Sequence, residues 1–299
     1  MRHATSWPSL SDQIDLARTL FGDVGQQMLT TWLEEQEARV DNPGFARLFT
    51  DHIDLPGVTS RDYTHRNIES SHGDLLGGIR FYGRDIGRPF VDVLAHSFDD
   101  IGALCDCVRT EWSMFSPRYL RMRARPGRLD GPKSLLDDSI HIVRYRDMRP
   151  PVDGVSLAPF SDAEEALAIV HRRYHRMAAD EPDLARNVSQ AEVEDLRRWH
   201  EAGQLRAIRV GDVTVGLIAV VPGRIGWIDG DEINEEVVEA EHSGHGYAVA
   251  AQAAWAAGAR DSERLLVGSI DRLNVASRKT AERAGRSHVL DDVFVRLTQ

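Results

Sequence analysis

One segment in the second half of the chain has residue types that suit the binding of a phosphate-bearing ligand. Glu241–Ala248 reads Glu-His-Ser-Gly-His-Gly-Tyr-Ala and joins a predicted strand to an alanine-rich predicted helix, Gly246–Ala259. Glycines permit a close backbone approach, and the free N–H groups at a helix N-terminus attract anions. The segment therefore predicts a pyrophosphate cradle, and a simple glycine turn is the alternative. The sequence contains neither GxGxxG nor GxxxxGK[ST], so dinucleotide-binding and P-loop sites are not predicted.

A second segment, Asn274–Gly285, follows after one short apolar strand, Leu265–Ile270. It has an Asn near its start and a Gly just past its end, which is typical of a capped helix. Taken alone, it predicts nothing more than an ordinary helix.

In this order, the two segments resemble the acyl-CoA-binding elements of the GNAT superfamily of N-acyltransferases. Glu241–Ala248 is similar to the superfamily loop Arg/Gln-x-x-Gly-x-Gly/Ala, with Gly246 and Ala248 at its last two fixed positions and Gly244 as a frequent extra glycine. Asn274–Gly285 is similar to the later Asn-x-x-Ser helix, which lies beside the pantetheine arm in that superfamily.

The resemblance covers about residues 155–299 and implies acetyl-CoA as the co-substrate. It implies that the cofactor-binding residues are Val237, Val238, Ser243, Gly244, His245, Gly246, Tyr247, Ala248, Asn274 and Ser277. No metal is expected.

Three positions depart from the superfamily pattern. Ser243 stands where Arg or Gln is usual, so one side-chain anchor for the cofactor phosphates is missing, although the backbone cradle remains. Ala281 stands where many members have a Tyr that protonates the departing thiolate, so the alternatives are another acid, such as Ser277 or water, or a step that needs little help from an acid. Arg286 stands where an aromatic residue is usual.

Acyl transfer to an amine also needs a proton acceptor, and the run from Asp229 to Glu241 is rich in carboxylates. By resemblance, the base lies on the strand before the cofactor loop, where Glu232, Glu235 and Glu236 are the candidates. Alternation along a strand places Glu235 and Glu236 on opposite faces, so at most one faces a given cleft directly. A solvated acidic edge is the alternative.

The elements that must position these residues form an α/β pattern. A chain of 299 residues favours two domains, and the Pro- and Gly-containing stretch Met148–Gly154 predicts a boundary, giving domains 1–150 and 151–299. The order in the second half is βααβββαβαβ, which is a mixed α/β pattern, and the resemblance implies that it forms a GNAT fold with a mixed sheet. Three details are predicted there: a helix opened by Ser189, a hairpin turn at Gly211-Asp212, and another turn at Pro222–Arg224.

The first half has no comparable glycine loop. Its predicted order is two helices, three strands, a helix and a strand, followed by a further strand at Ser139–Tyr145. This order resembles a degenerate GNAT half, as in tandem GNAT enzymes, and an unrelated α/β cap is the alternative.

Composition narrows the possible partners. The net charge of −11 argues against nucleic acid, and no apolar run is long enough to span a membrane. Cys105 and Cys107 are two residues apart and are expected to be free thiols. With no secretory signal recognised at the N-terminus, a cytoplasmic location is expected.

These observations predict an N-acetyltransferase that moves acetyl from acetyl-CoA to a primary amine. The acidic run favours a small cationic metabolite or antibiotic-like acceptor. Two alternatives are acetylation of a protein N-terminus and a non-catalytic acyl-CoA-binding sensor. The chain is expected to be a monomer or a homodimer.

Overall fold

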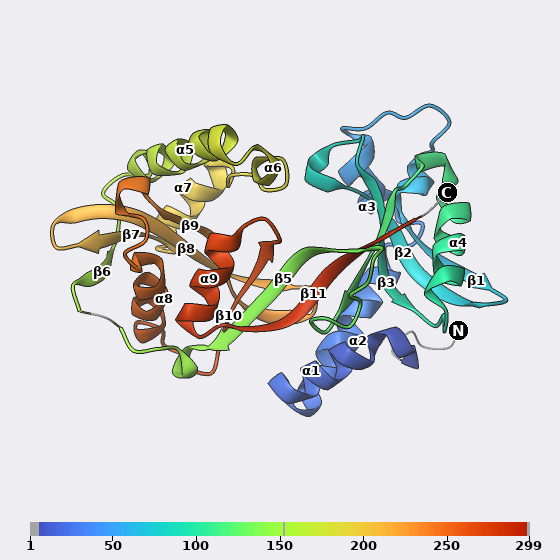
Figure 1. Ribbon diagram of the computed structural model, residues 1–299, viewed down its shortest axis with the longest axis horizontal. Coiled ribbons are helices and arrows are strands. Elements are labelled where there is room, and N and C mark those ends of the chain that lie inside the picture. The colour runs from blue at the N-terminus through green and yellow to red at the C-terminus, as the bar shows by residue number, and fades with distance from the viewer. Residues whose placement is uncertain (1–5, 152, 298–299) are drawn as a thin grey trace. The chain divides into compact units, whose positions relative to one another are not determined.

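The computed structural model describes residues 6–151 and 153–297 (Figure 1). The chain forms two compact units, the first comprising Met1–Asp137 with Leu290–Gln299 and the second Asp138–Val289. Both units contain helices and strands, which confirms the predicted mixed α/β class.

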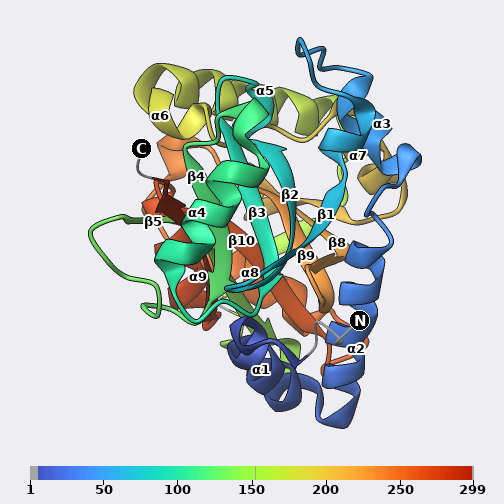
Figure 2. The same cartoon turned by 90° about the vertical axis from the view of Figure 1, so that its right-hand side faces the viewer.

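The first unit begins with helices and continues with a sheet. Its longer elements are α1 (Ser11–Phe21), α2 (Asp23–Glu37), α3 (Pro43–Thr50), β1 (His65–Ser70), β2 (Gly73–Phe81), β3 (Pro89–His96), α4 (Ile101–Glu111) and β4 (Tyr119–Ala124). The strand order is β1-β2-β3-β4-β11, where β11 spans Ser287–Arg296. Figure 2 shows β1 to β4 side by side with α4 across them. Leu104 and Val108 of α4 pack there on Leu75, Val91 and Leu120 of the sheet.

The second unit contains the predicted motifs. Its elements are β5 (Ser134–Arg144), β6 (Val155–Ala158), α5 (Ala163–Asp180), α6 (Pro182–Ala185), α7 (Val193–Glu201), β7 (Leu205–Val210), β8 (Val213–Ile225), β9 (Ile228–Val238), α8 (Tyr247–Ala257), β10 (Leu265–Asp271) and α9 (Val275–Ala284). The strand order is β5-β10-β9-β8-β7-β6. The short helices α3 and α6 were not predicted.

Alternation in β7 and β8 buries both faces of this sheet. Leu217 and Ala219 pack with α5 and α7, whereas Ile218 and Val220 pack with α8. Figure 1 shows α5 and α7 on one side of these strands and α8 on the other. The small residues of α8, Ala250, Ala251, Ala253 and Ala256, are buried. A helix of alanines can lie close to a sheet, and this closeness fixes where its N-terminus points.

The second sheet has one more strand, β6; its other five strands are arranged as in the first sheet, and each sheet is completed by a strand from elsewhere in the sequence. In the first, β3 and β4 are parallel neighbours and β11 is antiparallel to β4. In the second, β9 and β10 are parallel neighbours and β5 is antiparallel to β10. The strand β5, which lies near the end of the first half of the sequence, therefore completes the second sheet, and β11, at the end of the second half, completes the first. Because β5 and β11 each change unit along their length, the units do not coincide with the expected division into 1–150 and 151–299.

The predicted hairpin at Gly211-Asp212 is confirmed, since Val210 pairs with Val213. The predicted turn at Pro222–Arg224 is wrong, because β8 continues to Ile225 and Pro222 pairs with Asp231 of β9. The last residue of β8 that pairs with β7 is Ala219. Beyond it β8 is an edge, where proline costs no ladder hydrogen bond.

The helix expected to open at Ser189 instead begins at Val193, after Glu192 as the N-cap. Ala191 explains the difference, because its backbone N–H donates to the Glu235 carboxylate and holds this segment extended beside β9.

Among residues 6–151 and 153–297, no helix has the length and apolar character needed to cross a membrane.

Candidate functional site

The strands β9 and β10 separate part-way along their length. Their parallel pairing is confined to Asp231 with Leu266 and Glu232 with Val267, although both strands continue further. A register shift in the pairing of β8 with β9 leaves Asn234 as an extra residue between Ile233 and Glu235. Such a bulge bends a strand. The residues of β9 after Asn234 still pair with β8, but on their other side they border an opening instead of pairing with β10.

The glycine loop lies between β9 and α8. Gly244 and Gly246 have φ angles of 82° and 79°, in the left-handed region that favours glycine. A Cβ at either position would have no heavy atom within 4 Å in the described structure, so both face open space. Gly246 is the N-cap of α8, and no side chain of the described residues caps this helix. The loop therefore leaves helix N–H groups accessible to a ligand, as predicted for a pyrophosphate cradle.

A first cleft, of about 380 Å³, lies against this loop. Of the predicted cofactor-binding residues, nine line it: Val237, Val238, Ser243, Gly244, Gly246, Tyr247, Ala248, Asn274 and Ser277. His245, the tenth, instead stacks on Tyr247 with ring centroids 5.4 Å apart, and its Nδ1 is 2.9 Å from the Ser243 carbonyl oxygen.

A second cleft, of about 240 Å³, lies where β9 and β10 diverge. Both clefts are lined by the same five residues: Arg173, Glu236, Val237, Asn274 and Ser277. The second cleft is also lined by Tyr174, Glu235, Ser269, Asp271 and Arg286. The two clefts thus meet at β9 and the start of α9, and the second is bordered largely by polar side chains.

Glu236 lies at this meeting point. Its two carboxylate oxygens accept hydrogen bonds from Gln252 Nε2 of α8, at 3.0 and 2.9 Å. Burial raises the pKa of Glu236, while the charge of Arg286 and the Gln252 amide act in the opposite direction. A carboxylate with a raised pKa beside an opening is suited to accept a proton.

Glu235 points to the other face of the strand, as alternation predicts. Tyr174 of α5 donates its hydroxyl to Glu235 Oε1 at 3.2 Å, and the Ala191 N–H donates to Oε2 at 3.3 Å. Burial raises the pKa of Glu235 to about 7, against the smaller opposing effects of these donors and of Arg173. Glu235 therefore ties α5 and the segment before α7 to β9.

The remaining predicted catalytic residues lie at the borders of this region. Glu232 occupies the last position of β9 that pairs with β10, and burial raises its pKa. Ser277 lines both clefts, and its N–H donates to Asn274 Oδ1 at 3.1 Å, so Asn274 caps α9 as predicted. Ala281 is fully buried, so the absent tyrosine would have no room here in the present packing.

Several residues that border the clefts were not predicted. Arg172, Arg173 and Arg176 of α5 line the first cleft together with the glycine loop. Arg172 forms an ion pair with Glu239, and Arg173 forms one with Glu181 at 3.6 Å. Their close spacing in one helix was the available signal, because residues three and four apart share a helix face.

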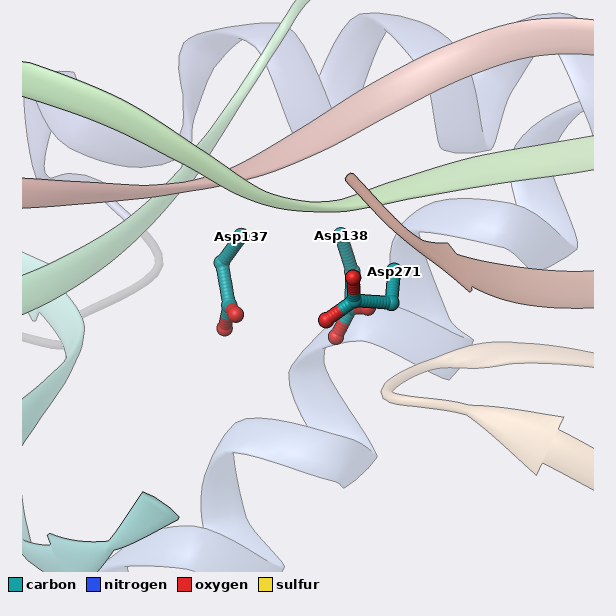
Figure 3. A group of neighbouring side chains, drawn as sticks. All are labelled: Asp137, Asp138 and Asp271. Atoms are coloured by element: carbon teal, nitrogen blue, oxygen red, sulfur yellow. The ribbon is translucent and has the colours of Figure 1, made fainter. Parts of the chain in front are cut away.

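Asp271 of β10, which also lines the second cleft, is the cross-strand partner of Asp138 of β5, and Figure 3 shows the two side chains next to each other. Asp271 Oδ1 accepts from the Leu273 N–H at 2.7 Å, and its Oδ2 accepts from Asn187 Nδ2 at 3.0 Å. Asp271 thereby holds the turn from β10 into α9.

The corresponding helix of the first unit, α4, has a different N-terminus. Its N-cap is Asp100, whose carboxylate accepts from the N–H groups of Gly102 and Ala103 at 3.1 and 3.0 Å. The helix N–H groups that are open in α8 are therefore occupied in α4. A carboxylate at this place would also repel phosphate.

No protein-family model matches this chain, and no curated protein matches its sequence. Solved structures do resemble it. An acetyltransferase of the GNAT family from Colwellia psychrerythraea is 10% identical, with 90% of this chain and 97% of that one covered and a TM-score of 0.48. A GCN5-related N-acetyltransferase from Sphaerobacter thermophilus is 15% identical, with 87% and 95% covered and a TM-score of 0.47. A tandem GNAT protein from the clavulanic acid biosynthesis pathway is 13% identical, with 79% and 83% covered and a TM-score of 0.43. These proteins are described as members of the superfamily whose motifs this sequence resembles.

Proposed function

We propose that the second unit is an acyl-CoA-dependent N-acyltransferase that transfers acetyl from acetyl-CoA to the primary amine of a small molecule. The observation that carries the proposal is the meeting of two clefts at diverging strands. One cleft is lined by an uncapped helix N-terminus with two open glycines, and the other by the carboxylates of Glu235 and Glu236.

The pyrophosphate of the cofactor would lie at the Gly244–Ala248 backbone. The missing Arg or Gln at Ser243 is offset by Arg172, Arg173 and Arg176, which face the same cleft from α5. Guanidinium groups bind phosphate oxygens through charge-assisted hydrogen bonds. The pantetheine arm would then pass along β9 toward Asn274 and Ser277, where the two clefts meet.

At that point the thioester carbonyl would face the second cleft, and the amine would attack it directly. The attacking ammonium must first lose a proton, since its pKa in water is about 10. Glu236 is the proposed acceptor because it alone among Glu232, Glu235 and Glu236 lines both clefts. As the tetrahedral intermediate collapses, the C–S bond breaks and the thiolate takes a proton from Ser277 or from water.

The rival functions differ in what they require of the second cleft. Acetylation of a protein N-terminus requires room for an extended peptide, whereas this cleft measures about 240 Å³ and favours a small acceptor. A non-catalytic acyl-CoA sensor requires only the first cleft, and the polar side chains that line the second cleft would then bind no ligand.

The test is turnover of acetyl-CoA by the full chain, followed by thiol release, over a panel of small amines and one N-terminal peptide. Release that depends on a small amine, with the acetylated amine identified by mass, supports the proposal. Tight CoA binding with no release for any acceptor would support the sensor instead.

A further inference from the structure

The guanidinium of Arg286, which lines the second cleft, has two nitrogen atoms with no hydrogen-bond partner among the described residues. Arg286 is 4% exposed, yet it is among the residues that line this cleft. Within the described part of the chain, its Nε and Nη1 atoms make no hydrogen bond. Buried arginines are normally paired, because an unpaired buried charge is strongly destabilising.

The backbone holds Arg286 firmly in this place. Gly285 ends α9 with a φ of 96°, and the Arg286 N–H donates to the Ala281 carbonyl at 2.9 Å, as in a Schellman motif. Gly268 of β10 provides the space for the side chain, since a Cβ there would lie 2.7 Å from Arg286 Nη1. Because Gly268 has no side chain, the Arg286 guanidinium can lie directly against β10.

The neighbouring acids do not neutralise this group by contact. The charge of Glu236 acts on Arg286, but neither Nε nor Nη1 of Arg286 has a hydrogen-bond partner among the described residues, Glu236 included. Burial lowers the pKa of Arg286, against the opposing effect of Glu236. Asp271 already accepts from Asn187 and Leu273. An anion that accepts hydrogen bonds from the Nε and Nη1 N–H groups of Arg286 would therefore both balance its charge and satisfy these donors.

We propose that Arg286 binds a carboxylate of the acyl acceptor, so that the substrate is an amine that also carries a carboxylate, such as an amino acid. This inference rests on the proposed function and specifies the substrate class of the same site. The acceptor's ammonium would lie toward Glu236 while its carboxylate completes the hydrogen bonding of the guanidinium. A planar guanidinium suits a carboxylate because it can donate two parallel hydrogen bonds.

The first experiment compares matched pairs of amines by calorimetry on the full chain with CoA present. Each pair consists of an amino acid and its carboxamide, which has the same size and the same amine but no negative charge. The amino acids of at least one pair should bind roughly 10- to 100-fold more tightly than the carboxamides, as charge-assisted hydrogen bonds imply.

The second experiment repeats this comparison with Arg286→Met. Removal of an unpaired buried charge should raise the thermal stability of the free protein, while the preference for amino acid over carboxamide disappears and CoA affinity stays unchanged. Gly268→Ala is the milder companion, since its Cβ displaces the guanidinium without removing it. It should reduce the same preference.

Equal affinity of the wild-type chain for both members of every pair would overturn the inference. So would an Arg286→Met variant that keeps the preference, or one that is less stable and weakens both members equally, as a structural role would require. These outcomes are separate from failure of the proposed function, which would appear as absent CoA binding or absent acyl transfer with every amine.

Discussion

Gln252 donates its side-chain amide to both carboxylate oxygens of Glu236, at 3.0 and 2.9 Å, and so holds a carboxylate of β9 from the neighbouring helix. Gln252 is fully buried, and its own Oε1 has no partner among the described residues. The amide thus stabilises the charged form of Glu236.

Replacement of Gln252 by Leu should therefore raise the pKa of Glu236, because the hydrogen bonds that favour the carboxylate are lost. If Glu236 is the base, the acidic limb of the kcat/KM profile will move to higher pH in this variant. A pH–rate profile of the two proteins checks this, and an unmoved limb would mean that Glu236 does not take the proton.

Glu236→Gln should reduce kcat on the order of 10²–10⁴-fold, because the proton acceptor is lost. CoA affinity should stay near normal, and the acidic limb of the profile should vanish. Glu235→Gln is the matched control on the opposite face and should change kcat little. If Glu235→Gln loses activity and Glu236→Gln does not, Glu235 is the proton acceptor. If both variants stay active, the remaining candidate for the proton acceptor is Glu232, acting through water.

Glu235 should make folding stability depend on pH. Its folded pKa of about 7 lies above its unfolded value, so the native state retains this proton to higher pH. The contribution of Glu235 to the free energy of unfolding should be greatest below about pH 4.5. It should decrease as the pH rises to about 7 and then level off, and the total change should be up to about 3 kcal/mol. Urea unfolding of Glu235→Gln at pH 5 and pH 8 tests this, because the variant should lose part of the decline seen in wild type. Identical declines would count against it.

Gly246→Val should weaken CoA binding roughly 10- to 100-fold, since a branched side chain would fill the open space at the helix N-terminus. Gly211→Val is the control: Gly211 also has a positive φ and open space at its Cβ, but lies in the β7–β8 hairpin. Both variants carry similar backbone strain, and only the first should lose affinity in calorimetry. Full affinity in a folded Gly246→Val protein would exclude this loop as the cradle.

The chain should bind one CoA, not two. The α4 N-terminus is already occupied by the Asp100 carboxylate, whereas that of α8 is open. Calorimetric titration should give a stoichiometry near one per chain. A value near two would show that the first unit also holds the cofactor.

The sequence predicted the order of elements in the second unit well, because its strands and helices have distinct apolar periods and clear glycine signals. It could not show that β5 and β11 exchange sheets, since the alternation of polar and apolar residues along a strand does not indicate which strand it pairs with. In the site, the glycine loop and the acidic strand were visible as local motifs. Tyr174 and Gln252 were not, because they reach Glu235 and Glu236 across 61 and 16 positions of the chain. Arg286 was visible in the sequence as a departure from the superfamily pattern, but its proposed role depends on its burial, which the sequence does not show.

The exchange of β5 and β11 also limits how this protein can be divided. Arg123 of β4 and Asp292 of β11 are joined by an ion pair at 2.8 Å although 169 positions separate them. During synthesis, β4 cannot pair with β11 until the whole second unit has left the ribosome, because β11 follows that unit in the sequence. No single cut in the chain would yield two fragments that each hold a complete sheet, so the halves cannot be shuffled between proteins as independent modules.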